Sequence, residues 1–182
     1  MTKLFSLLLL ICVSPIFAIV ALVIIMADGF PIFFCQKRIG MNNKYFWIYK
    51  FRTMKKNIPN IPSHLISTPK LYFTKSGSTL RKLSLDELPQ LINIVKGEMG
   101  FIGPRPALYN QDDLIKLRTE KNIHKLKPGV TGWAQVNGRD DLSILQKVEL
   151  DEYYLKNKSI WLNMKIILMT VPQFLIPKGV SH

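Results

Sequence analysis

The sequence has few of the residues that build disulfide frameworks or zinc sites. Its 182 residues include two cysteines and three histidines. Two cysteines are too few for a disulfide framework and Cys12 lies inside an apolar run, so we expect both it and Cys35 to be free thiols. The histidines are isolated and lack zinc-ligand spacing. Disulfide-stapled modules and zinc proteins are therefore disfavoured.

Acidic residues are also scarce. Asp and Glu number 12 against 25 Lys and Arg, which gives a formal net charge of +13. This excess favours anionic partners, which include nucleic acid, phosphate-bearing substrates and anionic lipid surfaces. Charge alone does not choose among the three.

The common phosphate-binding fingerprints are missing, since there is neither a P-loop nor a dinucleotide-binding glycine motif. The glycine-rich stretch 128–139 contains Gln135, Asn137 and Arg139 and suits backbone approach to a phosphate or nucleotide. By itself this stretch is a weak signal.

A long apolar run occupies the N-terminus. From Leu4 to Ala27 the chain carries no charge, and a helix needs only about 20 residues to span a bilayer core. The run continues well past Ala18, which argues against a signal peptide cleaved there. Ser14-Pro15 in its middle predicts a kink or break, with the Ser14 hydroxyl bonded to a freed carbonyl.

Basic residues flank this run on both sides, with Lys3 before it and Lys37, Arg38 and Lys44 after it. A re-entrant hairpin with both ends in the cytosol satisfies this symmetry. A tilted single span with a proline kink is the alternative, and the residues alone leave both open.

The rest of the chain predicts a mixed, helix-rich α/β fold. Aromatic composition indicates the strands, prolines mark the loop, and apolar spacing indicates the helices. The last apolar stretch is interrupted by polar residues and suits a helix that lies on a membrane surface. We expect a strand or interfacial packing at 30–36, a strand at 45–49, a loop at 57–70, and helices at 86–96, 140–156 and 160–176.

Two adjacent carboxylates, Asp86 and Glu87, lie at the predicted start of the helix over 86–96, with Pro89 in its first turn. Ser84 and Glu87 match a capping box, and acidic residues are common at helix starts because they complement the helix dipole. The same physics suits chemistry. An ionised Asp beside a second acid that holds a divalent cation can act as a nucleophile toward phosphorus.

Pro104 and Pro106 bracket Arg105 and restrict the backbone around it. A guanidinium presented from such a stiff, extended segment suits a phosphate clamp. An exposed arginine in a turn is the alternative.

Together these segments resemble the bacterial sugar transferase family, in particular its small monotopic phosphoglycosyl transferases. The matching segments occur in the family's order across nearly the whole chain. They are Ser14-Pro15, Gln36-x-Arg38-x-Gly40, Lys50-Phe-Arg-Thr-Met54, Leu80 to Gln90, Lys96-Gly-Glu-Met99, Gly103-Pro-Arg-Pro106 and Pro128 to Arg139.

The resemblance implies a monotopic protein of the bacterial inner membrane, with a re-entrant helix hairpin at 1–29. A small catalytic domain with interfacial amphipathic helices, at 30–182, would lie at the cytoplasmic face. The implied reaction moves a sugar 1-phosphate from a UDP-sugar to polyprenyl (undecaprenyl) phosphate and releases UMP, as the first membrane step of glycan or polysaccharide biosynthesis. The implied partners are these two substrates and membrane lipids, and not nucleic acid.

The resemblance also assigns roles to residues. Asp86 would be the nucleophile that holds the sugar phosphate covalently, Glu87 would complete the dyad, and both would hold Mg²⁺. The phosphate- and substrate-binding set would comprise Arg81, Arg105 and Arg139, then Lys50 and Asp151, and then Pro104, Pro106, Gln135 and Asn137.

Two features depart from the family pattern. Ser6 stands where many members have an acidic residue, and the chain begins shortly before the apolar run without the extra spanning helices of larger relatives, which favours the minimal form. The alternative to an enzyme is a membrane-tethered basic module that binds anionic lipid or nucleic acid. Such a module would tolerate loss of Asp86 and Glu87.

Overall fold

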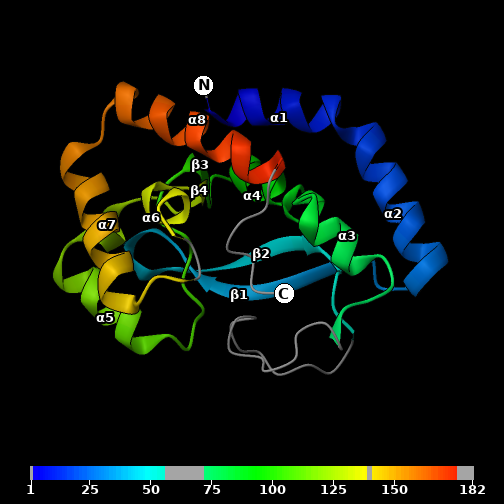
Figure 1. Cartoon of the computed structure of the whole chain (residues 1–182), viewed down its shortest axis with the longest axis horizontal. Coiled ribbons are helices and arrows are strands. Elements are labelled where there is room, and N and C mark those ends of the chain that lie inside the picture. The colour runs from blue at the N-terminus through cyan, green and yellow to red at the C-terminus, as the bar shows by residue number, and fades with distance from the viewer. Residues whose placement is uncertain (1, 56–71, 139–140, 176–182) are drawn as a thin grey trace. The chain divides into compact units, whose positions relative to one another are not determined.

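The computed structural model describes residues 2–55, 72–138 and 141–175 and confirms a mixed, helix-rich fold (Figure 1). Helices dominate, and the strands form two sheets of two strands each. In chain order the elements are α1 (Thr2–Cys12), α2 (Ser14–Asp28), β1 (Phe33–Ile39), η1 (Met41–Asn43), β2 (Tyr45–Phe51), α3 (Gly77–Lys82), η4 (Leu85–Glu87), α4 (Gln90–Lys96), β3 (Gly100–Ile102), α5 (Asp112–Glu120), η5 (Ile123–Lys125), β4 (Gly129–Thr131), α6 (Trp133–Val136), α7 (Ile144–Asn157) and α8 (Ile160–Leu175). The loop predicted at 57–70 lies outside the described residues.

The chain forms two compact units. The first contains the described residues of Met1–Gln36 and Ile48–Lys96, and the second contains Lys37–Trp47 and the described residues of Gly97–Val180. The N-terminal helices therefore belong to the same unit as the Asp86 segment. The division predicted at residue 29, between a membrane segment and a catalytic domain, is a functional one and stays a prediction.

The predicted break in the apolar run is confirmed. α1 and α2 meet at an angle of 57° at the Ser14-Pro15 step (Figure 1). Pro15 lies in the first turn of α2, where a missing N–H is tolerated, and the Ser14 hydroxyl donates to the Ile11 carbonyl at 2.7 Å. No described helix alone is long and apolar enough to cross a membrane, although the bent pair together is.

One face of α2 packs into the first unit. Its Val20 and Ile24 form a buried cluster with Phe51 of β2 and Leu80 of α3. Most of the other large apolar side chains of α1 and α2 are exposed, whereas Phe17 packs partly buried against this cluster, and α8 in the second unit exposes another apolar set. The exposed residues are Leu4, Phe5, Leu7, Leu8, Ile11, Ile16, Ile19, Leu22, Val23 and Met26 on α1 and α2, and Ile160, Trp161, Met164, Ile167, Leu168 and Val171 on α8.

The helix predicted over 86–96 begins later than expected. Asp86 lies in the 3₁₀ turn η4, and α4 begins only at Gln90. Pro89 explains the delay, because it has no N–H to donate to the Leu85 carbonyl, and the Leu88 amide binds that carbonyl at 3.2 Å instead. The predicted capping box is wrong, because Ser84 adopts a left-handed conformation and makes no side-chain cap.

The helix predicted over 140–156 also begins later. α7 starts at Ile144, and Ser143 caps it through a reciprocal pair of bonds with Gln146. The cap sets the start because the Ser143 hydroxyl accepts from the Gln146 amide, which would otherwise have no partner in the first turn. The helix predicted over 160–176 is present as α8.

Candidate active site

Asp86 is buried in the first unit. It lies in η4 with 5% of its surface exposed, between the Ser84 turn and α4. The left-handed backbone of Ser84, at a φ of 54°, turns the chain from the end of α3 into this short 3₁₀ segment. The structure therefore holds Asp86 in a tight turn and not at the N-terminus of an α-helix.

Glu87 forms an ion pair with Lys50, which lies near the end of β2. Lys50 Nζ is 2.7 Å from Glu87 Oε1, and the two side chains are only 14% and 15% exposed. A charge-assisted bond in such a partly buried place is stronger than a surface pair. The structure thus brings together the dyad residue Glu87 and the predicted phosphate-binding residue Lys50.

Arg81 also lies in the first unit, in the last turn of α3. Its guanidinium lies over the ring of Phe73, 5.2 Å from the ring centroid. Stacking of this kind orients an arginine, because the ring contacts the plane of the guanidinium.

The Gly103–Pro106 segment lies in the second unit, immediately after β3. β3 and β4 are parallel, with Gly100 opposite Gly129 and Ile102 opposite Thr131. The two strands approach very closely, because a Cβ on Gly129 would lie 2.1 Å from the Gly103 nitrogen. At this position the glycine of the 128–139 stretch serves close backbone packing, a use that the sequence analysis did not foresee.

The segment itself is fixed through its carbonyls. The prolines at 104 and 106 are buried and have no N–H, so the backbone of each can be held by hydrogen bonds only through its carbonyl oxygen. The Pro104 carbonyl accepts from the Gly129 amide at 3.0 Å, and the Pro106 carbonyl accepts from Arg38 Nη1 at 3.0 Å. Arg105 between them is half-buried.

The Arg105 carbonyl accepts from Arg118, a residue of α5 that the sequence analysis missed. Arg118 Nη1 donates at 2.8 Å, while its Nε and Nη2 donate to Asp151 Oδ2 at 3.0 and 2.6 Å. The helical spacing of Arg118 from Leu114 places both on the buried face of α5. A charged residue on an apolar face was the signal available in the sequence.

Asp151, a candidate for substrate contact, is instead buried on α7 with 1% of its side chain exposed. Burial raises the pKa of its carboxyl group above the usual value, and the Arg118 guanidinium opposes that rise. In this structure the carboxylate binds Arg118 and is closed off from solvent.

The remaining candidates differ in exposure. Gln135 of α6 is buried and its amide points at the Gly103 carbonyl, 3.5 Å away. Asn137 is exposed and its amide donates to the Trp133 carbonyl at 2.7 Å. Arg139 lies outside the described residues.

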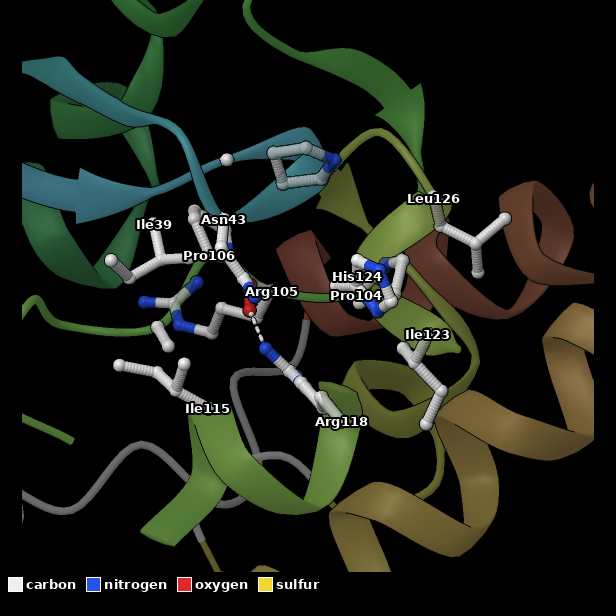
Figure 2. A pocket seen from close by; sticks show the side chains of 13 residues that line it. Ile39, Asn43, Pro104, Arg105, Pro106, Ile115, Arg118, Ile123, His124 and Leu126 are labelled. Atoms are coloured by element: carbon white, nitrogen blue, oxygen red, sulfur yellow. Dashed lines mark hydrogen bonds between the residues drawn. The ribbon is translucent and has the colours of Figure 1, made fainter. Parts of the chain in front are cut away.

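A small pocket lies beside the Arg105 segment within the second unit (Figure 2). In Figure 2 the Arg118 guanidinium is directed at the Arg105 carbonyl, and the Arg105 side chain extends toward Ile39 and Ile115. His124 lines the same pocket. Cationic and apolar side chains therefore surround this pocket.

Magnesium fits the donor chemistry of the dyad. Mg²⁺ commonly takes one or two carboxylates from a protein and completes its shell with water and substrate phosphates. Asp86 and Glu87 supply two such groups. Over the ranges that the structure describes, no group of three His, Cys, Asp or Glu side chains is placed to hold a metal ion.

The first unit holds an acid pair and the second unit holds a proline-braced arginine, and residues of these types suit a group-transfer enzyme that acts on phosphates. The chain belongs to the bacterial sugar transferase family, whose model matches residues 1–177. The resemblance predicted from the sequence is therefore confirmed, and the chain is a transferase.

Relatives support this assignment. The chain is 43% identical over 176 residues to the uncharacterized sugar transferase EpsL of Bacillus subtilis (strain 168), covering 96% of this chain and 85% of that one. It is 40% identical over 179 residues to the undecaprenyl-phosphate glucose phosphotransferase of Komagataeibacter xylinus, covering 91% of this chain and 33% of that one. It is 38% identical over 173 residues to the UDP-glucose:undecaprenyl-phosphate glucose-1-phosphate transferase of Escherichia coli (strain K12), covering 90% and 37%.

Proposed function

We propose that this chain transfers a sugar 1-phosphate from a UDP-sugar to undecaprenyl phosphate and so starts a glycan or polysaccharide. The match of residues 1–177 to the family carries the proposal, because relatives within it are named for this transfer. The net charge of +13 supports it, since both substrates are anionic.

Asp86 is the proposed nucleophile. A carboxylate oxygen of Asp86 attacks the phosphorus that bears the sugar, the bond from that phosphorus to the UMP oxygen breaks, and UMP leaves. A phosphate oxygen of undecaprenyl phosphate then attacks the same phosphorus and displaces Asp86, which gives undecaprenyl diphosphosugar. Burial of Asp86 supports this route, because it restricts the access of water that would hydrolyse the covalent intermediate.

The neighbouring groups have electrostatic roles in this proposal. Asp86 and Glu87 would hold Mg²⁺, which would neutralise the pyrophosphate oxygens. Lys50 holds the Glu87 carboxylate in place through the 2.7 Å ion pair. Arg81 and Arg105 would bind phosphate oxygens, because a guanidinium matches their geometry.

The bent pair α1 and α2 is the proposed membrane anchor, in the bacterial inner membrane with the site on the cytoplasmic face. The exposed apolar side chains of both helices support this assignment, since water would be a poor environment for so many of them. The exposed apolar face of α8 supports contact with the membrane surface.

The covalent route is tested by mass spectrometry on the detergent-solubilised chain. With a panel of UDP-sugars, Mg²⁺ and no lipid acceptor, the wild-type chain should gain the mass of one sugar phosphate and release a matching burst of UMP. The adduct should map to Asp86. Asp86→Asn should show neither signal, and its turnover with acceptor should fall by about a thousandfold or more.

Asp112→Asn is the matched control, because Asp112 is an exposed aspartate on α5 and should leave turnover unchanged. An adduct on Glu87, or a folded Asp86→Asn variant with turnover near wild type, would show that the nucleophile is another residue. A chain that releases no UMP but binds anionic lipid would instead favour the basic binding module.

A further inference from the structure

We propose that the buried Arg118–Asp151 ion pair is a positioning device that fixes the backbone of Arg105 and hence the direction in which its guanidinium meets a phosphate. This inference rests on the proposed function only for the role of Arg105 in phosphate binding. Arg118 and Asp151 are positioning residues in it, because they act through Arg105 and contact no substrate.

Asp151 sets the orientation of the Arg118 guanidinium. Asp151 Oδ2 accepts from both Nε and Nη2 of Arg118, which fixes the plane of the guanidinium. The remaining nitrogen, Nη1, then has a set direction and donates to the Arg105 carbonyl at 2.8 Å. Asp151 on α7 thereby determines where the backbone of residue 105 lies. Figure 2 shows the bond from Arg118 to the Arg105 carbonyl.

The segment that receives the Arg118 bond, residues 104–106, has few backbone N–H donors of its own. It is neither helix nor strand, and two of its three residues are prolines without an N–H. Its position therefore depends on donors that reach its three successive carbonyls. Gly129 and Arg38 hold the flanking prolines, and Arg118 holds the carbonyl of Arg105 itself.

The buried ion pair is not needed for stability alone. Buried ion pairs are often no more stabilising than well-packed apolar residues of similar volume, because desolvation opposes the attraction. α5 and α7 already share an apolar cluster that contains Leu114, Ile123 and Val148. Apolar packing therefore joins the two helices without the ion pair. The bond that the pair directs to the Arg105 carbonyl gives the reason for its presence.

The test is a cycle of variants in the full-length chain. Arg118→Met with Asp151→Leu removes both charges at similar volume, so the fold should survive with a melting temperature within about 5 °C of wild type. kcat/KM for UMP release, measured with the most active UDP-sugar of the panel, should fall at least thirtyfold. In an Arg105→Ala background the same double change should lower kcat/KM less than threefold, because the residue being positioned is absent.

The dissociation constant of UMP gives a second reading of the same cycle and does not need turnover. It should rise at least tenfold in the double variant and stay constant between Arg105→Ala and the triple variant. The matched control is Lys121→Gln with Glu152→Gln, which removes an ion pair that links the end of α5 to α7 without reaching Arg105. It should leave both measurements within twofold of wild type.

A folded double variant with wild-type kinetics overturns the inference, as does a loss that persists in full in the Arg105→Ala background. Should the double variant fail to fold, Arg118→Lys decides, since it keeps one charged bond to Asp151 but lacks the third N–H. It should lose at least tenfold in kcat/KM with Arg105 present and less than threefold without it. A wild-type chain that releases no UMP from any UDP-sugar contradicts the proposed function, whereas an active wild type with additive losses contradicts the positioning role alone.

Discussion

Lys50 and Glu87 form a partly buried ion pair one residue from the proposed nucleophile. If Glu87 holds Mg²⁺, Lys50 competes with the cation for the same carboxylate, because both neutralise its charge. In that case the pair would set how much Mg²⁺ the enzyme needs.

Lys50→Met should lower the Mg²⁺ concentration for half-maximal UMP release at least threefold, which corresponds to about 0.7 kcal/mol. Maximal turnover should also fall, since Glu87 loses the group that orients it. Lys50→Arg keeps the charge and should stay close to wild type. An unchanged Mg²⁺ requirement in Lys50→Met would exclude Glu87 as a magnesium ligand.

Arg105→Lys should lower turnover at least tenfold, about 1.4 kcal/mol in the barrier, because lysine keeps the charge but lacks the planar fork. Arg118 binds the carbonyl of residue 105, so this substitution leaves the backbone contact in place. Steady-state UMP release with saturating acceptor measures the effect. Unchanged kinetics would identify Arg105 as an arginine that does not touch phosphate.

At this scale the sequence predicted which residue types belong to the site but not how each is held. Asp151 and Gln135 were expected to contact substrate, and the structure buries both. A polar residue inside a helix has the same appearance in a sequence whether it faces a ligand or a buried partner. The pairing of Arg118 could not be predicted, because its partner Asp151 is distant in the sequence and belongs to another helix.

At the scale of elements, local chemistry explains both the success and the error. The break at Ser14-Pro15 was predictable, because proline removes a hydrogen bond wherever it lies in a helix. The late start of α4 was harder to foresee, because Pro89 is compatible with a first helical turn as well as with a preceding 3₁₀ turn. Only the left-handed Ser84, which shapes the preceding turn, separates the two outcomes.

The end of α2 is anchored within the first unit by Asp28 and Arg52. Arg52, buried after β2, donates to the Asp28 and Gly29 carbonyls at 2.7 Å each. The Asp28 carboxylate accepts from the Lys75 amide at 2.8 Å and from the Ser76 amide and hydroxyl. These bonds tie the last turn of α2 to the two residues that immediately precede α3.

Burial alone would raise the pKa of the Asp28 carboxyl, but hydrogen bonds from Ser76 and Lys75 outweigh it and leave the pKa below its usual value. Folding therefore favours the ionised carboxylate. Its contribution to stability is complete above the unfolded-state pKa, near pH 4, and is lost as the pH falls through the lower folded-state pKa.

Asp28→Asn should lower the free energy of unfolding at pH 7 by about 1 kcal/mol, because the hydrogen bonds lose their charged acceptor on a half-exposed site. The difference between the variant and wild type should shrink as the pH falls below about 4, where the unfolded chain and then, at lower pH, the folded chain takes up a proton on Asp28. Denaturant unfolding in detergent at pH 7 and pH 3 measures both values. Glu149→Gln, an exposed change on α7, should show no such pattern, and a difference that persists at pH 3 would argue against a role for the charge.

At the scale of the whole molecule, the sequence predicted the mixed α/β class and the family but not the division into units. β1 and β2 each contribute residues to both units, so no linker or composition change marks the boundary. Periodicity identifies elements one at a time, whereas a unit is defined by contacts between distant segments. The Asp86 segment and the Gly103–Pro106 segment consequently belong to different units although few residues separate them in the chain.

The topology of the N-terminal helices is the largest-scale prediction. A single cysteine at Thr2 or at Lys44, in a chain without Cys12 and Cys35, should react with an impermeant maleimide only from the cytoplasmic side, because a re-entrant hairpin broken at Ser14-Pro15 would return the chain to the side from which it entered. Lys44 is exposed and suits labelling, whereas the side chain of Asn43 is bonded to Thr119.

Pro15→Ala tests whether the bend causes this topology. Alanine restores the N–H that Pro15 lacks, so α1 and α2 should join into one helix of about 40 Å, long enough to cross the bilayer core. Labelling at residue 2 should then appear on the opposite side while labelling at residue 44 stays cytoplasmic. Intact cells and inside-out vesicles give the two readings. Labelling of wild-type residues 2 and 44 on opposite sides would establish a tilted span. A Pro15→Ala chain that is labelled at both residues from the cytoplasmic side would show that packing within the first unit, and not the proline, holds the helices on one side.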